Sequence, residues 1–127
     1  MPQNTETALL YNLKNSDSGR KLTLILLKMK VRIRSVDPSQ YLQPIGLLAG
    51  LRNLSGTANS YEGPNFSEPM LLLRGFADSR LDVLLSAMRR SEIQIPFKAV
   101  LTSENQTWNS LELYEELKKE HEAFHRS

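Results

Sequence analysis

Cysteine is absent from this sequence, and its absence removes several kinds of chemistry at once. The chain can form no disulfide, no thiolate nucleophile and no cysteine-ligated zinc centre. Because a chain without cysteine suits a reducing compartment, we expect a cytoplasmic protein. Long apolar runs are also absent: the longest, residues 22–27, is far too short to cross a bilayer. Residues 1–7 do not resemble a signal peptide, so we expect a soluble protein without membrane contact.

Phosphate-binding loops and catalytic triads are missing too. Residues 12–19 follow the first predicted strand but contain a single glycine, whereas the dinucleotide fingerprint needs three and the P-loop needs two. Both histidines lie near the end of the chain, which makes a Ser-His-Asp arrangement improbable. We therefore expect no cofactor and no enzymatic activity.

His121 and His125 fit the pattern H-E-x-x-H, in which two histidines one helical turn apart bind zinc. A catalytic zinc site needs three protein ligands, and no third ligand follows His125. His121 also follows Leu117 by one helical turn, so the simpler interpretation places it at the rim of an apolar helix stripe. We predict no functional metal site, although the pair could bind nickel or zinc adventitiously.

What is present is typical of one globular domain of 127 residues, with 40% hydrophobic and 24% charged side chains. The net charge of +2 is divided unevenly. Residues 1–66 carry eight Lys or Arg and four Asp or Glu, a balance of +4, whereas residues 67–127 carry eight and ten, a balance of −2. Neither balance is strong enough to identify a partner.

The first half of the chain predicts a strand–helix–strand unit over residues 8–36. Its first strand is apolar on both faces, as in a central strand, whereas residues 31–36 alternate apolar and basic side chains, as in an edge strand. Between them, apolar residues at 22, 25, 26 and 29 form one helical stripe. Asp37 and Pro38 predict a helix start, but Pro44 and Gly46 limit the helix that follows. Residues 37–69 are therefore predicted as a short helix and a long loop.

The second half repeats this order over residues 70–102. A fully apolar strand begins at Met70, a helix stripe at 81, 84, 85 and 88 repeats the spacing of the first helix, and a strand begins at Phe97. Asn109 and Glu112 resemble a capping box and predict a terminal helix over residues 109–124.

The alternation of strands and helices predicts an α/β fold, a three-layer sandwich around a four-stranded, mainly parallel sheet. The two apolar strands belong in the centre, which gives the order 2-1-3-4. Right-handed crossovers between parallel strands would place the first and last helices on one face and the other two on the opposite face. The alternative is a ferredoxin-like α+β fold with an insertion at residues 38–69.

In a mainly parallel sheet, the carboxyl ends of the strands are where ligands bind. That arrangement would gather seven polar residues into one strand-end crevice, without a nucleophile and base pair among them. They are Asn12, Lys14, Asp37, Arg74, Asp78, Thr102 and Asn105.

A basic patch at Lys30, Arg32 and Arg34 is a second candidate for binding, because such a face can hold phosphate or RNA. The more ordinary interpretation is an edge strand whose charges prevent pairing with other chains. No aromatic residue is interleaved with these residues, so bases would have no stacking platform, and we do not expect nucleic acid as the main partner.

Residues 68–121 resemble a small family of bacterial domains of unknown function, seen mainly in anaerobes. The resemblance rests on Glu68-Pro-Met-Leu-Leu-Leu-Arg-Gly-Phe76, on Leu-Asp-Val-Leu-Leu at 81–85, on Lys98-Ala-Val-Leu-Thr102, on Asn105-x-x-Trp108 and on Glu-Leu-x-x-Glu-His121. It implies no activity, cofactor or catalytic residue. It does draw attention to Lys98, Thr102, Asn105 and Trp108 as speculative ligand-binding residues. Their structural interpretation is a turn in which Thr102 or Asn105 bonds backbone amides and Trp108 closes the core.

These observations predict a non-enzymatic accessory or regulatory module that binds another protein or itself. The alternative is a small-ligand or phosphate-binding module that uses the strand-end crevice, with the long loop as a lid. RNA binding through the face of Arg32 and Arg34 is a weaker alternative.

Overall fold

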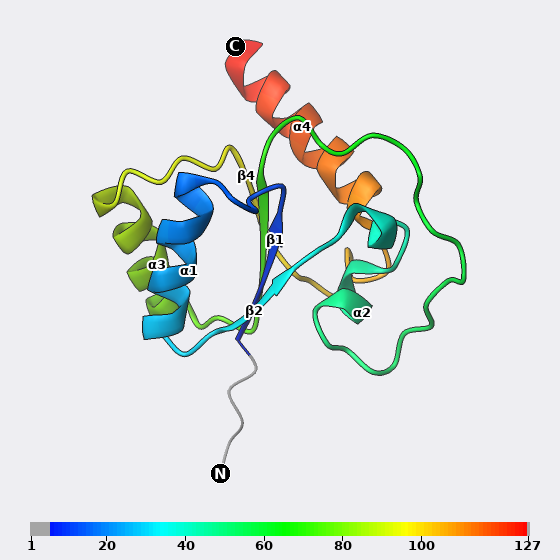
Figure 1. Ribbon diagram of the computed structural model, residues 1–127, viewed down its shortest axis with the longest axis horizontal. Helices are drawn as coiled ribbons and strands as arrows, with labels where there is room; N and C mark the ends of the chain where they lie inside the picture. The colour runs from blue at the N-terminus through cyan, green and yellow to red at the C-terminus, as the bar shows by residue number, and fades with distance from the viewer. Residues whose placement is uncertain (1–5, 127) are drawn as a thin grey trace.

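The computed structural model describes residues 6–126, with the side chains of residues 6–123, and shows one mixed sheet between two layers of helices (Figure 1). Residues 1–5, which cover most of the segment examined for a signal peptide, lie outside the described part. No helix in that part is long and apolar enough to cross a membrane. The elements are β1 (Thr7–Tyr11), α1 (Asp17–Lys28), β2 (Arg32–Ser35), the 3-10 helix η1 (Pro38–Gln40), α2 (Ile45–Leu48), β3 (Met70–Arg74), α3 (Asp78–Arg90), β4 (Phe97–Val100) and α4 (Ser110–Arg126).

The sheet confirms the predicted α/β fold and strand order, β2-β1-β3-β4. The β1–β2 and β3–β4 pairs are parallel, and the central β1–β3 pair is antiparallel. Each strand–helix–strand unit therefore pairs its own two strands directly. In a ferredoxin-like fold another strand would lie between them, so that alternative is not formed.

The predicted division of the helices between the two faces is wrong. Figure 1 shows α1 and α3 together on one side of the sheet, with α2 and α4 on the other. The cause is the reversed direction of β3. The strands of the second unit run in the opposite direction, and its second strand, β4, lies at the opposite edge of the sheet from β2. With both the direction and the edge reversed, a right-handed crossover places α3 on the same face as α1.

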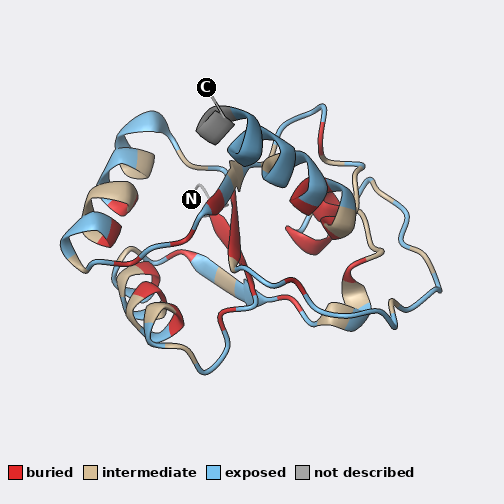
Figure 2. Ribbon diagram, turned by 90° about the horizontal axis from the view of Figure 1, so that it is seen from above, coloured by how far each residue is buried: buried red, intermediate tan, exposed pale blue. Residues whose placement is uncertain are grey.

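Alternate residues of the central strands supply two separate cores. In β1, Ala8 and Leu10 face α1 and α3, whereas Leu9 and Tyr11 face α2 and α4. All four are almost completely buried. This double burial explains why the sequence of β1 is apolar throughout instead of alternating. Figure 2 shows the same pattern, with buried residues concentrated in the central strands and on the inner sides of the helices.

The segment from η1 to β3 contains the predicted short helix and long loop. The Asp37 carboxylate accepts a hydrogen bond from the Ser39 amide at 3.1 Å, as a cap should. The long loop is held by stacked aromatic rings: Phe66 lies 4.4 Å from Tyr41 and 4.0 Å from Tyr114, measured between ring centroids. This loop is therefore fastened to the body through its rings.

Candidate functional site

The single strand-end crevice expected from the sequence does not form. Because β3 runs antiparallel to β1, the carboxyl ends of these two strands lie at opposite ends of the sheet, measured along the strands. The seven polar residues are divided between these two ends. Asn12, Lys14 and Asp37 follow β1 and β2 at one end. At the other end, Arg74 closes β3, and Asp78, Thr102 and Asn105 follow β3 and β4.

The turn from Thr102 to Trp108 uses its polar atoms to build structure. The Asn105 side chain is buried, accepts a hydrogen bond from the Thr102 amide at 2.8 Å and donates one to the Val100 carbonyl at 3.1 Å. The Trp108 carbonyl accepts a hydrogen bond from the Ile45 amide at 2.7 Å, so the turn also holds the start of α2. The bond from the Thr102 amide and the packing of the partly buried Trp108 against the core are the contacts that the structural interpretation of the turn predicts. A ligand-binding role for these residues remains a prediction.

Lys98 lies apart from that turn. Its ammonium group donates a hydrogen bond to the Ile95 carbonyl at 2.7 Å, beyond the start of β4, whereas Thr102 follows the end of the same strand. The Lys98 side chain is exposed at the edge of the sheet. The structure therefore brings Thr102, Asn105 and Trp108 together but leaves Lys98 at the other end of the strand.

The basic patch lies on β2, one of the two edge strands of the sheet, and just before it. Arg34 donates hydrogen bonds to the Leu48 carbonyl at 3.2 Å and to the Gln40 side chain at 3.1 Å. Arg32 is exposed on the same face of the sheet, and Lys30 precedes the strand in a left-handed conformation with φ of 61°. One arginine of the patch thus supports the end of α2, and the other extends beside the edge.

The histidine pattern does not form a recognisable metal centre in the part that the structure describes. His121 packs edge-on against Phe97, with ring centroids 5.5 Å apart, which agrees with its predicted place at the rim of the stripe. The side chain of His125 lies outside the described residues. Among the described residues, no three His, Asp or Glu side chains are placed to hold a metal ion.

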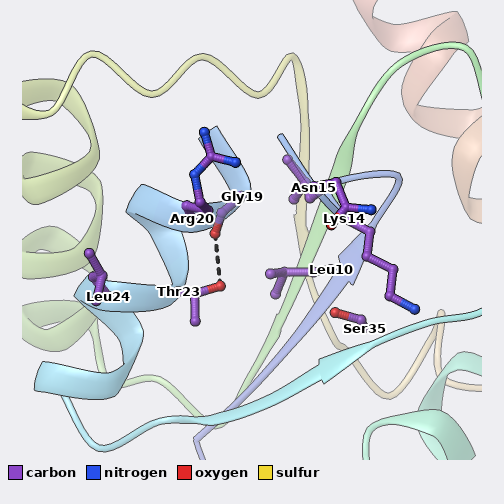
Figure 3. Close-up of a pocket in the computed structure, with 9 residues that line it drawn as sticks. Leu10, Lys14, Asn15, Gly19, Arg20, Thr23, Leu24 and Ser35 are labelled. Atoms are coloured by element: carbon purple, nitrogen blue, oxygen red, sulfur yellow. Dashed lines mark hydrogen bonds between the residues drawn. The ribbon is translucent and has the colours of Figure 1, made fainter. Parts of the chain in front are cut away.

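One feature that the sequence did not predict is a hollow of about 400 Å³ between α1 and the ends of β1 and β2, which we call the α1–β2 hollow (Figure 3). Its volume lies within the range of small-ligand pockets, about 300–1,000 Å³. Figure 3 shows Leu10 and Thr23 pointing toward one another across it. The residues that line it are Leu10, Leu13, Lys14, Asn15, Gly19, Arg20, Thr23, Leu24 and Ser35.

The turn between β1 and α1 determines the shape of this hollow. Asn12 and Asn15 have φ of 57° and 62°, a left-handed conformation that asparagine tolerates well. The Ser16 hydroxyl accepts a hydrogen bond from the Gly19 amide at 2.9 Å and caps α1. A Cβ atom on Gly19 would lie 2.0 Å from the Leu13 carbonyl oxygen, so only glycine allows the helix to begin this close to β1.

Apolar surface and positive charge meet at the hollow. Leu24 is 61% exposed at its border, and Leu27, one helical turn further on, is 58% exposed. Lys14 and Arg20 are the charged residues of the lining; no carboxylate belongs to it, but the Arg20 guanidinium forms an exposed ion pair with the Asp17 carboxylate at 3.5 Å. Both leucines lie off the buried stripe of α1. In the sequence, only the positions of these leucines off the stripe point to this surface, and exposed leucines are too common for that signal to decide.

The polar groups that line the hollow can donate and accept hydrogen bonds. The Thr23 hydroxyl is engaged by the Gly19 carbonyl at 2.8 Å, and the lining contains no histidine or carboxylate that could act as a base. The arrangement in the hollow suits an apolar group that carries a nearby negative charge.

On the other face of the sheet, burial raises the pKa of Tyr11 well above its usual value, so its phenol stays protonated against the Ser110 hydroxyl at 2.8 Å.

The fold defines a small three-layer α/β domain whose candidate binding surface lies in its first unit. Residues 69–124 carry a domain of unknown function (DUF3783), which spans β3, α3, β4 and most of α4. This finding confirms the resemblance read from the second half of the sequence. No curated protein and no solved structure matches the chain. The α1–β2 hollow lies wholly outside the matched residues.

Proposed function

We propose that this protein is a non-enzymatic accessory or regulatory module that binds another protein through the α1–β2 hollow. The observation that carries the proposal is the exposure of Leu24 and Leu27 beside a hollow with a mainly apolar lining. Covering one exposed leucine completely is worth about 1.5–3 kcal/mol, so two leucines can supply a large part of the energy of a specific contact. A cytoplasmic location belongs to the same proposal, since a sequence without cysteine suits a reducing compartment.

A comparison of two matched variants tests this proposal. Leu24→Gln replaces the apolar border of the hollow with an uncharged polar side chain. Val100→Gln makes the same kind of change at a 45% exposed position on β4, the opposite edge of the sheet. We expect the wild type and Val100→Gln to capture the same cellular partner, and Leu24→Gln to fail to capture it. Capture that is equal for all three proteins contradicts the proposal.

The second candidate function is binding of a small molecule with an apolar body and an anionic group. It is favoured by the position of the hollow, since the carboxyl ends of the parallel strands β1 and β2 and the start of α1 meet there. Lys14 and Arg20 would contact the anionic group. A thermal-shift screen of carboxylates and phosphates tests it, because a ligand at a hundred times its Kd stabilises a protein by about 2.7 kcal/mol. If no ligand raises the melting temperature of the wild type more than that of a Lys14 variant, this candidate function is contradicted.

RNA binding through the face of Arg32 and Arg34 stays the weaker alternative. Its support is the positive charge of β2, and it still lacks an interleaved aromatic residue. Binding of mixed RNA that falls steeply with salt would favour it, and salt-independent or absent binding would dispose of it.

A further inference from the structure

The edge strand β2 offers a backbone that is paired on one side only. The amides of Arg32 and Val36 donate hydrogen bonds to the carbonyls of Glu6 and Leu10, both at 3.0 Å. Because successive peptide groups of a strand point to opposite sides, the amides and carbonyls of Ile33 and Ser35 point away from β1. An unpaired row of this kind is a template for another strand.

The two faces of β2 have different chemistry. Ile33 and Ser35 lie on the face of α1, where Ser35 lines the α1–β2 hollow. Arg32 and Arg34 lie on the face of α2. A strand added beside β2 would continue this alternation, with one set of side chains over the apolar hollow and the other beside the arginines.

We propose that the partner of this module is an extended peptide segment that pairs with β2 and alternates apolar and acidic side chains. The apolar side chains would cover Leu24, Leu27 and the hollow, and the acidic ones would lie opposite Arg32 and Arg34. This inference rests on the proposed function, because it names the class of partner for the same surface. It also gives the basic patch a role, since the charges that discourage random pairing select an acidic strand.

A second copy of the same chain is a poorer occupant of this edge. In an antiparallel pair of two β2 strands, the outward residues can pair as Ile33 with Ile33, as Ile33 with Ser35 or as Ser35 with Ser35. The first register places Arg32 opposite Arg34 and the second places Arg34 opposite Arg34, whereas the third overlaps the two strands only at their last residue. Like charges directly opposite one another destabilise a strand pair, so the charge of this edge favours a partner of opposite sign.

The test is a selection of short peptides from a random displayed library on the full chain, followed by titration of the enriched peptide. We expect enriched sequences in which apolar and acidic residues alternate. Arg32→Glu and Leu24→Gln should each weaken binding of the peptide about tenfold or more, as central contacts do. Arg89→Glu, an exposed charge change on α3, and Val100→Gln are the matched controls and should leave the affinity unchanged.

Three results would overturn the inference: no enrichment, enrichment of basic peptides, or equal binding of a scrambled peptide of the same composition. The last result would show attraction by charge without strand addition. If a cellular partner is still lost with Leu24→Gln while no peptide is enriched, the proposed function stands and the inference about its partner fails. If neither the partner nor the peptide depends on Leu24, the proposed function itself fails.

Discussion

The two strand–helix–strand units of this protein share a plan and differ at the turn between their first strand and helix. In the first unit, the turn is built from left-handed asparagines and a serine cap, and it leaves the α1–β2 hollow open. In the second unit, Phe76 packs from the corresponding turn against the core, and Ala77, the residue before α3, offers no side-chain cap. The family match covers the second unit and the candidate binding surface lies in the first, so the shared domain and the surface are separate features.

The largest expected effect comes from separating the two units. The residues of β3 pair along their whole length with β1, and both cores contain residues from both strands. A fragment of residues 69–127, which contains the matched segment, should therefore remain unfolded on its own. Circular dichroism and proton NMR of the fragment provide the measurement. Cooperative thermal unfolding of that fragment would show that the matched segment is an independent domain.

The two units should contribute equally to stability through their helices. Leu22 on α1 and Leu84 on α3 are both fully buried in the same core. Leu22→Ala and Leu84→Ala should each lower the free energy of unfolding by about 2–5 kcal/mol, because each leaves a cavity in a packed interior. Urea denaturation measures both values. If one variant is nearly neutral, the shared core of α1 and α3 is not closely packed around that helix.

A buried hydrogen bond joins the first unit to the terminal helix. The phenol of Tyr11 on β1 and the hydroxyl of Ser110 on α4 are both buried. Tyr11→Phe should cost about 1–3 kcal/mol of unfolding free energy, since the Ser110 hydroxyl loses its partner. A double-mutant cycle with Ser110→Ala should show that the two changes are not additive. Additive losses would mean that this bond contributes nothing to the junction.

The same tyrosine gives a pH dependence with a definite sign. Burial raises the pKa of Tyr11, and it raises that of Tyr41 to about 12. The folded protein therefore keeps protons that the unfolded chain loses near the ordinary tyrosine pKa of 10.0. Stability should be full below that pH and fall as the pH rises above it. The fall should be shallower in Tyr11→Phe than in the wild type, and equal slopes would contradict burial of the phenol.

The smallest expected effect on stability is at the candidate binding surface. Leu24→Gln should change the free energy of unfolding by no more than about 0.5 kcal/mol, because the side chain is mostly exposed. The melting temperature of the variant checks this. A large loss of unfolding free energy would mean that Leu24 supports the fold. Leu24 would then not differ from buried leucines such as Leu22, and its exposure would no longer argue for binding.

Much of the fold could be predicted from the residues. Apolar strands at residues 8 and 70 gave the central position of β1 and β3, and Asn109 with Glu112 gave the capping box, whose two hydrogen bonds measure 2.9 and 2.8 Å. The direction of β3 could not be predicted. A strand buried on both faces has the same apolar pattern whichever way it runs, and the faces of the helices depended on that direction.

The candidate site was harder to predict than the fold. The sequence singled out Thr102 and Asn105, whose groups bond one another within a turn. It did not single out Leu24, because one exposed leucine on a helix is common and carries no signal by itself. What makes Leu24 noteworthy is the hollow beside it, which depends on the close start of α1 at Gly19. That approach is a tertiary feature that local patterns do not encode.

Amide hydrogen exchange with and without the selected peptide tests whether a strand is added beside β2. We expect the outward amides of Ile33 and Ser35 to become protected when the peptide is bound, because they gain hydrogen bonds from the added strand. The amides of β4, at the other edge of the sheet, should not change. Protection confined to residues 69–124, with β2 unchanged, would contradict the account and would place the binding surface in the family domain.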